Sequence, residues 1–387
     1  MFGTNHAPYR KDALCMGAFT RSDTFASARD HRIDFWRGLC LIDMVLVHLY
    51  YSDVQMGQWV GRILGEYTRF AAGGFVFVAG LAIGAVFLPK ARQPQQRGRT
   101  YRRLWMRSLR ILGWQYIVAI TWVDLTVWLG SHPAGEGMGR LLLDVVTFRE
   151  GGALLPLYVL LIALAPLLLE VRRRHWGWMA IAPISIGLFV YGRFHPYSLS
   201  FDSTGNFAPL LWQLVFVCGL LAGSLLRRYD ALTARTKAWI CAAAWGGFAL
   251  MFWCEWWTEL GLPACPIRPL FAKVPLTTAE FIRYLTLTGG LLTASDLAWN
   301  WLSQTWLASF AATLGRSTLP VYVAHTFLIE YCRWKAEVWK SYGTWQILFV
   351  PVCLSLLWLL AVALQWRQRR PEPVLEWTAA QPAPTVP

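Results

Sequence analysis

Long apolar stretches recur along this chain, and short segments rich in charge, glycine or proline separate them. A helix rises about 1.5 Å per residue, so about 20 mostly apolar residues are needed to cross the hydrocarbon core of a bilayer. Ten stretches come close to that length: residues 34–51, 69–89, 104–130, 151–170, 177–192, 207–226, 238–258, 279–302, 317–337 and 345–366. The pattern predicts an all-α integral membrane protein with about ten transmembrane helices.

Positive charge predicts how these helices are oriented. Basic clusters occupy alternate connections, at residues 90–110, 172–174 and 227–237, and another cluster at 367–370 follows the last stretch. Cytoplasmic loops of membrane proteins carry an excess of Lys and Arg. With ten spans, both termini then lie in the cytoplasm.

Three regions follow from this topology. Residues 1–33 form a cytoplasmic N-terminal segment, and residues 34–366 form one transmembrane domain of ten helices. Residues 367–387 are rich in Pro and Ala and are predicted to be a disordered cytoplasmic tail.

Composition narrows the range of partners. The chain is 56% hydrophobic and only 15% charged, whereas soluble domains carry about 25% charged residues. A net charge of +14 would suggest nucleic acid in a soluble protein, but here the basic residues lie between apolar stretches. We therefore expect a lipid bilayer around the protein and no nucleic acid. The eight cysteines lack the spacing of metal ligands, so no metal site is predicted, and Cys254 with Cys265 could form one external disulfide.

Arg37 and His48 lie within the first apolar stretch, where ionisable side chains are costly. The two are eleven residues apart. On a regular helix their side chains are then only about 20° apart around the axis, so they share one face, and they lie about 16 Å apart along the axis. A neutral imidazole can take a proton from a hydroxyl group as its oxygen attacks an electrophile, so His48 is the candidate catalytic base. The simpler alternative is that Arg37 reaches lipid headgroups and His48 only makes hydrogen bonds.

Three further charged residues, Asp43, Asp34 and Arg32, lie near Arg37 and His48. Asp43 lies about 140° around the helix from His48, so it assists His48 in catalysis only if the helix bends or another helix intervenes. Otherwise Asp43 is the partner of a buried polar group in another span. Asp34 either pairs with Arg37, one turn away, or caps the helix. Arg32 lies just outside the stretch and is expected to contact lipid headgroups.

A second basic group opens the third stretch. Arg103, Arg107 and Arg110 follow an i, i+4, i+7 spacing and share a helical face. Guanidinium groups suit phosphate oxygens, so Arg107 and Arg110, which lie deepest, are candidate contacts to a phosphorylated cofactor. Attraction to anionic lipid is the alternative, and it is the expectation for Arg102 and Arg103.

Polar residues inside other stretches add further candidates. Tyr322 and His325 share a face at i, i+3 and either contact the cofactor or act as hydrogen-bonding struts between helices. Tyr158 and Gln213 are candidate catalytic groups, because either could stabilise an oxyanion. Gly73, Gly74 and Gly80 are expected to let their helix approach the first one closely.

The run Arg32-x-Asp34-Phe35-Trp36-Arg37-Gly38, followed by His48, resembles the arginine–ten–histidine motif of acyltransferase-3-type membrane acyltransferases. The closer similarity is to the OpgC family, which succinylates osmoregulated periplasmic glucans. Four further segments resemble that family in the same order: Gly74–Gly80, Leu155–Tyr158, Asn206–Gln213 and Leu314–Val321. Ala79 stands where the broader superfamily often has Ser.

The resemblance implies a multi-pass enzyme of the bacterial inner membrane that takes acyl-CoA from the cytoplasm, with succinyl-CoA as the first candidate donor. It implies a ten-helix acyltransferase domain over residues 34–366, with His48 as the catalytic base and Arg37 as a cofactor contact. The implied acceptor is a periplasmic glucan or another saccharide. Direct transfer is expected, because no activated Ser or Cys stands out in the sequence.

Two other functions stay open. A carrier or exporter of an anion or a saccharide could use the same intramembrane charges as an ion pathway, although such carriers often have inverted repeats, and this sequence shows none. An acetyltransferase that modifies a different cell-envelope sugar is the third possibility.

Overall fold

The computed structural model describes residues 30–51, 70–128, 154–174, 176–199, 201, 207–256, 268–271, 275–334 and 348–369. Over these residues the protein is helical and contains no strand, so the prediction of an all-α protein is confirmed. The elements are α1 (His31–Tyr51), α3 (Phe70–Ala82), the π-helix η1 (Ile83–Phe87), α4 (Leu88–Arg92), α5 (Pro94–Trp128), α7 (Leu154–Arg173), α8 (Gly177–Phe194), α9 (Pro209–Asp230), α10 (Ala234–Trp256), the 3₁₀-helix η2 (Arg268–Phe271), α11 (Thr278–Leu297), α12 (Trp299–Leu302), α13 (Trp306–Arg316), α14 (Thr318–Trp334) and α16 (Phe349–Arg369).

Six helical segments of the described chain are long and apolar enough to cross a membrane. They are Phe70–Arg92, Leu154–Arg173, Gly177–Phe194, Pro209–Asp230, Ala234–Glu255 and Phe349–Gln368. α1 is not among them, and Asp34, Arg37 and Asp43 lower its hydropathy. The protein is therefore a helical membrane protein, while ten spans and cytoplasmic termini stay predictions. The tail after residue 369, most of the N-terminal segment and Cys265 lie outside the described residues.

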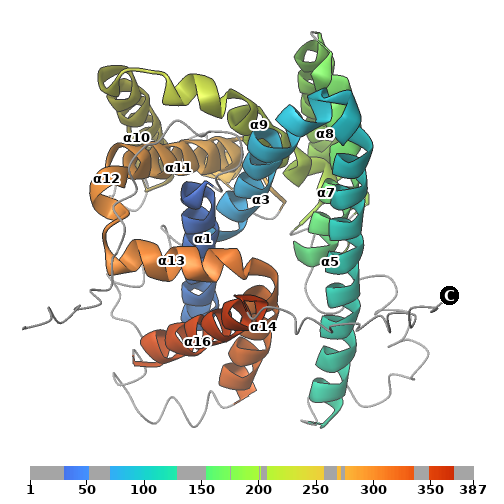
Figure 1. Ribbon diagram of the computed structural model, residues 1–387, viewed down its shortest axis with the longest axis vertical. Helices are drawn as coiled ribbons and strands as arrows, with labels where there is room; N and C mark the ends of the chain where they lie inside the picture. Colours follow the sequence, from blue (N-terminus) through green and yellow to red (C-terminus); the bar gives the residue numbers. More distant parts are fainter. Residues whose placement is uncertain are drawn as a thin grey trace, which may run out of the picture.

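Helix α1 lies at the centre of the fold, where it contacts α3, α13, α14 and α16 (Figure 1). On one side of the molecule, the long α5 packs against α7, and α7 packs against α8. On the opposite side, α10 and α11 pack against each other. α14 also contacts α5, so helices distant in sequence meet around α1.

Helix α13 was not predicted and makes the most extensive packing contact with α1. The expectation for residues 303–316 was a loop, and it is wrong. The helix begins after Thr305, whose side-chain oxygen accepts a hydrogen bond from the Ala308 amide at 3.2 Å. Gly38 of α1 lies against the backbone of Ala311, and Gly315 lies against the backbone of Asp34. Glycine at both points allows the two helices to cross with their backbones in contact.

A second close crossing joins α3 to α9. Gly80 packs on the backbone of Phe216, while Gly219 and Gly223 pack on the backbone of α3 and the start of η1. Gly84 of η1, four residues after Gly80, packs on the backbone of Leu220. Each side of the crossing therefore contributes two glycines four residues apart, a spacing that favours close helix packing in membranes. Gly73, Gly74 and Gly80 were expected to let α3 approach the first helix closely, and the expectation is wrong. Gly73 packs on the ring of Tyr284 in α11, Gly74 lies against the ring of Phe70 in its own helix, and Gly80 lies against α9.

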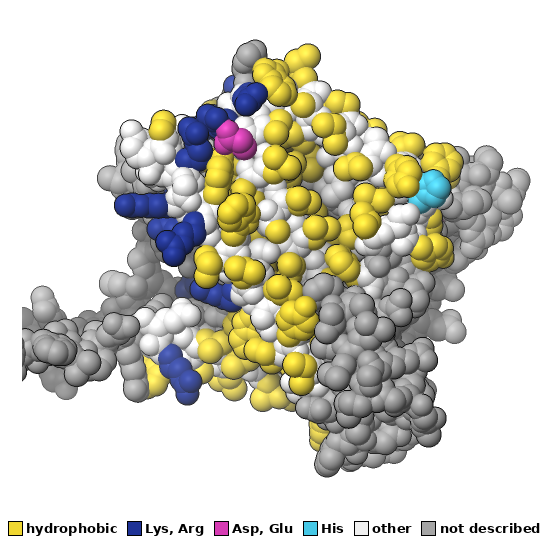
Figure 2. Space-filling model, turned by 90° about the vertical axis from the view of Figure 1, so that its right-hand side faces the viewer, with side chains coloured by type: hydrophobic (Ala, Val, Ile, Leu, Met, Phe, Trp, Pro, Cys, Tyr) yellow, Lys and Arg dark blue, Asp and Glu magenta, His cyan; other side chains and the backbone are white. Residues whose placement is uncertain are grey.

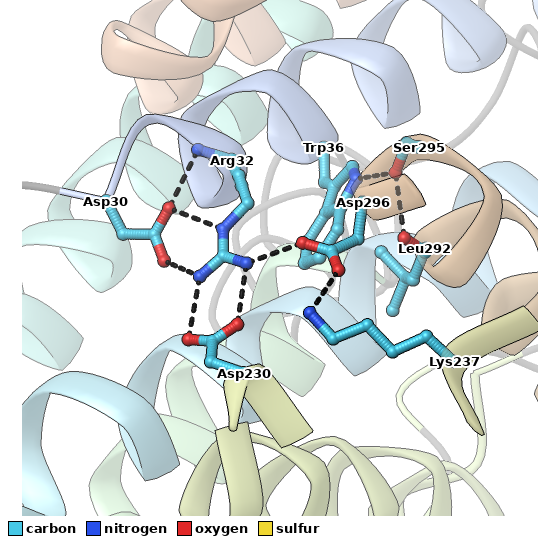
Figure 3. Close-up of polar contacts among 8 residues, drawn as sticks. All are labelled: Asp30, Arg32, Trp36, Asp230, Lys237, Leu292, Ser295 and Asp296. Carbon is cyan, nitrogen blue, oxygen red and sulfur yellow. Dashed lines mark hydrogen bonds and ion pairs between the residues drawn. The ribbon is translucent and has the colours of Figure 1, made fainter. Parts of the chain in front are cut away.

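An ion-pair cluster holds the start of α1 against three other helices (Figure 3). The Arg32 guanidinium donates to Asp30 at 2.9 Å, to Asp230 at the end of α9 at 2.8 Å and to Asp296 of α11 at 2.6 Å. Lys237 of α10 donates to the second oxygen of Asp296 at 2.9 Å. The expected contact of Arg32 with lipid headgroups is therefore wrong, because carboxylates from two other helices and Asp30 occupy its donors.

Replacing Arg32 should destabilise the fold. Arg32→Met leaves Asp30, Asp230 and Asp296 close together without their shared cation, and breaking a buried ion pair on one side costs about 3–5 kcal/mol. Since Arg32 is partly exposed, we expect the lower end of that range. The measurement is the thermal unfolding midpoint in detergent, with Arg99→Met on the exposed surface of α5 as the control; equal midpoints would contradict the prediction.

Candidate active site

Aromatic and imidazole rings from four helices form a continuous group beside α1. His48 of α1 lies 5.5 Å from His325 of α14, measured between ring centroids. His325 lies 4.9 Å from Tyr322, and Phe75 of α3 lies 6.3 Å from Tyr322 and 5.4 Å from Tyr158 of α7. The structure thus brings together four predicted site residues, His48, Tyr158, Tyr322 and His325, from three regions more than 100 positions apart in sequence.

Tyr158 joins this ring group to two arginines. Its side chain is buried, and its hydroxyl group has no hydrogen-bond partner among the described residues. It lies close enough to Arg37 of α1 and Arg107 of α5 to interact with both electrostatically. The phenolic O–H is therefore an available donor near two permanent cations. Arg37 also lies 3.9 Å from the carboxylate of Asp34, which confirms the pairing of these two residues.

The arginine stripe of α5 divides between the interior and the surface. Arg107 is half-buried and lies near Tyr158, whereas Arg102, Arg103 and Arg110 are exposed. Figure 2 shows that Lys and Arg side chains gather along one edge of a broad hydrophobic face of the molecule. The arginine nearest the ring group on α5 is thus Arg107.

Hydrogen bonds between α5 and α7 fix this arrangement. Ser108, next to Arg107, donates to the carbonyl oxygen of Val159 at 2.8 Å, and Trp105 donates to Ala163 at 3.2 Å. Nearer the cytoplasmic end by the predicted topology, Tyr101 donates to Glu170 at 2.6 Å. Burial raises the pKa of Tyr101 to about 12, and the bond to Glu170 adds to this shift, so its hydroxyl stays protonated and keeps the bond at neutral pH.

His325 has a defined hydrogen-bonding state. Its ring is buried, with 2% of its surface exposed, and its Nδ1 contacts the backbone carbonyl oxygen of Tyr322. A carbonyl oxygen only accepts, so Nδ1 carries the proton. Nε2 then bears a lone pair, and it has no hydrogen-bond partner in the part of the chain that the structure describes.

Asp43 and Gln213 lie apart from these contacts. Asp43 is fully buried, and neither carboxylate oxygen has a hydrogen-bond partner among the described side chains and backbone. The Gln213 amide donates to the carbonyl oxygens of Ser185 at 2.8 Å and Leu210 at 3.2 Å, so it links α9 to α8. Their catalytic roles stay predictions, and the contacts of Gln213 suit a structural strut.

A family model described as OpgC protein matches residues 29–138 and 140–369. The chain belongs to the OpgC family. The resemblance drawn from five short segments is thereby confirmed, and membership implies an acyltransferase of the membrane-bound type. No curated protein and no solved structure matches the chain.

Sequence reasoning missed part of the interior of this OpgC family protein. Phe75 links Tyr158 to Tyr322, yet no sequence pattern distinguishes one apolar aromatic residue from its neighbours. Arg283 of α11 is buried with 2% exposure and pairs with Glu255 and Glu280. The spacing of Glu280 and Arg283 at i, i+3 inside an apolar stretch was the available signal, and it repeats the spacing of the Asp34 and Arg37 pair.

Proposed function

We propose that this OpgC family protein is an O-acyltransferase that moves an acyl group, with succinyl as the first candidate, from acyl-CoA to a hydroxyl group of a periplasmic glucan or another saccharide. The observation that carries the proposal is the connected group of His48, His325, Tyr322 and Tyr158, which adjoins Arg37 and Arg107. This group combines a base, a hydroxyl donor and cations within a membrane domain.

In the proposed reaction, His48 takes the proton of the acceptor hydroxyl as the oxygen attacks the thioester carbonyl carbon. The new C–O bond forms, and the C–S bond breaks. Tyr158, whose hydroxyl has no hydrogen-bond partner among the described residues, donates it to the oxyanion that develops on the carbonyl oxygen. His48 then returns the proton to the departing thiolate. The products are free CoA and the ester, and His48 is again neutral and ready for the next turnover.

Donor and acceptor are proposed to enter from opposite sides. With span one running outward, Arg37 lies toward the cytoplasm and His48 toward the periplasm, about 16 Å apart. Arg37 and Arg107 would hold the anionic part of the donor, while the pantetheine arm, which has a comparable length, extends toward His48. The inner-membrane location, ten spans and two cytoplasmic termini belong to this proposal, and accessibility labelling of single cysteines placed in the loops tests them.

The function itself is tested by CoA release from detergent-purified protein. Succinyl-CoA and acetyl-CoA are each supplied with and without a β-glucan. Acceptor-dependent release would support the acyltransferase and rank the donors. The absence of release from folded protein with every donor and acceptor would favour the carrier or exporter, for which a flux assay in proteoliposomes is the next test.

Arg107 and Arg110 provide a matched pair of variants on one helix. Arg107 adjoins Tyr158 and Arg110 is exposed, so Arg107→Gln is expected to raise the KM for the acyl-CoA donor by about tenfold or more, as the loss of a charge-assisted hydrogen bond of about 1.5–3 kcal/mol would do. Arg110→Gln should have a much smaller effect. Equal changes in donor KM would assign both residues to general attraction of the anionic donor.

A further inference from the structure

We propose that His325 positions His48 for proton transfer, by accepting a hydrogen bond from a ring N–H of His48 through Nε2. The inference rests on the proposed function, because it assigns a partner to the base named there. His325 then acts through His48 and touches neither substrate, which differs from the cofactor contact expected from its spacing with Tyr322.

The first argument is the protonation state of the His325 ring. The Tyr322 carbonyl oxygen holds the proton on Nδ1. A second proton on Nε2 would place a positive charge on a buried ring, which is costly without a counter-charge. The neutral ring therefore presents a lone pair on Nε2, and a buried acceptor without a donor is itself unfavourable. A donor at this position would satisfy the ring.

The second argument is distance. Two imidazoles that share one N–H···N bond have ring centres roughly 5.1 Å apart, since about 2.9 Å between the nitrogens adds to about 1.1 Å from each nitrogen to its ring centre. The observed separation of His48 and His325 is 5.5 Å, with the ring planes inclined at 45°. The ring separation is therefore within about half an ångström of the hydrogen-bonded value, and in the proposed pair a reorientation of the His48 ring completes the bond.

The third argument is what this bond would do for catalysis. A catalytic base works best when a third group holds its ring in one orientation and one tautomer. With one N–H of His48 bound to His325, the other ring nitrogen presents its lone pair to the acceptor hydroxyl. Once His48 takes up the proton, the same N–H becomes the donor of a charge-assisted bond, which is stronger. The proton then leaves to the thiolate, and the pair returns to its starting state.

The experiment compares His325→Leu, His325→Gln and His48→Gln in the full-length purified protein. Leu removes the acceptor, whereas Gln places an amide oxygen near the position of Nε2. We expect His325→Leu to lower kcat by about 10²-fold, at the bottom of the range for general base catalysis, with unchanged KM values and an unchanged unfolding midpoint. His325→Gln should recover most of the loss. Equal kcat values for His325→Leu and wild type, or for the Leu and Gln variants, would overturn the inference.

A second readout needs no turnover. Diethyl pyrocarbonate acylates an unprotonated imidazole nitrogen, and peptide mapping by mass spectrometry follows His48 separately from the other histidines. His48 should react more slowly in His325→Leu than in wild type at the same pH, with His325→Gln between them; identical rates would overturn the inference. Normal turnover in His48→Gln would instead overturn the proposed base. Wild-type protein that is inactive with every donor would count against the proposed function, and the modification rates would still decide the role of His325.

Discussion

His48→Gln is expected to reduce acyl transfer by about 10²- to 10⁴-fold, the range that general base catalysis contributes to enzymatic rates. The amide of Gln can make hydrogen bonds but cannot take up the hydroxyl proton. Because His48 lies in the last turn of α1, close to His325, and is only partly buried, an amide of similar size should not disturb the packing. The measurement is kcat for acceptor-dependent CoA release, together with the unfolding midpoint.

His195 offers the control for this variant. It directly follows α8 and is exposed, and its ring contacts that of Tyr191. It is distant in sequence from the site residues of α1. His195→Gln should keep wild-type turnover. If His48→Gln retained more than about a tenth of the wild-type rate, well above what loss of a general base allows, the base would have to be another group.

Gly38→Ala is expected to prevent normal assembly of the fold. A Cβ atom at Gly38 would overlap the backbone carbonyl of Ala311 in α13, and a carbonyl group of a helix cannot move without its helix. Overpacking of interiors typically costs about 1–3 kcal/mol and can cost more when backbone must shift. We expect a lower yield of folded protein, a lower unfolding midpoint and loss of CoA release, because α1 carries both Arg37 and His48.

The same substitution at Gly113 is the matched control. Gly113 lies within α5, and a Cβ atom there would meet open space. Gly113→Ala should therefore be neutral or stabilising by about 0.5–1 kcal/mol, since alanine favours the helix. Equal destabilisation by the two variants would mean that the crossing of α1 and α13 tolerates an added methyl group.

Local patterns in the sequence were sufficient to predict the long apolar helices and to identify α1 as the helix that carries the main site residues. Hydrophobic length alone located each apolar stretch that is helical in the structure. The charges of Arg37 and His48 stood out because charge is rare within apolar stretches. α13 was missed for the converse reason: its 11 residues are too few to cross a membrane, so length did not separate it from a loop.

Spacing along one helix could not show which way that helix faces. The i, i+4, i+7 stripe of α5 placed three arginines on a common face, but the hydrogen bond from Ser108 to Val159 sets the rotation that leaves Arg107 inward and Arg110 exposed. Arg32 was assigned to lipid because its partners Asp230 and Asp296 lie about 200 or more positions away in sequence. No local pattern carries that information.

The sequence by itself determined a helical membrane protein of the OpgC family, with a histidine and an arginine on one face of its first helix. Those features depend on hydropathy, on helical periodicity and on short motifs, all of which act over a few residues. Tertiary structure alone decided that His325, Tyr158 and Arg107 meet around that helix. The reason is physical: side chains from α1, α5, α7 and α14 approach one another only after glycine crossings, interhelical hydrogen bonds and the Arg32 cluster have set how the helices pack.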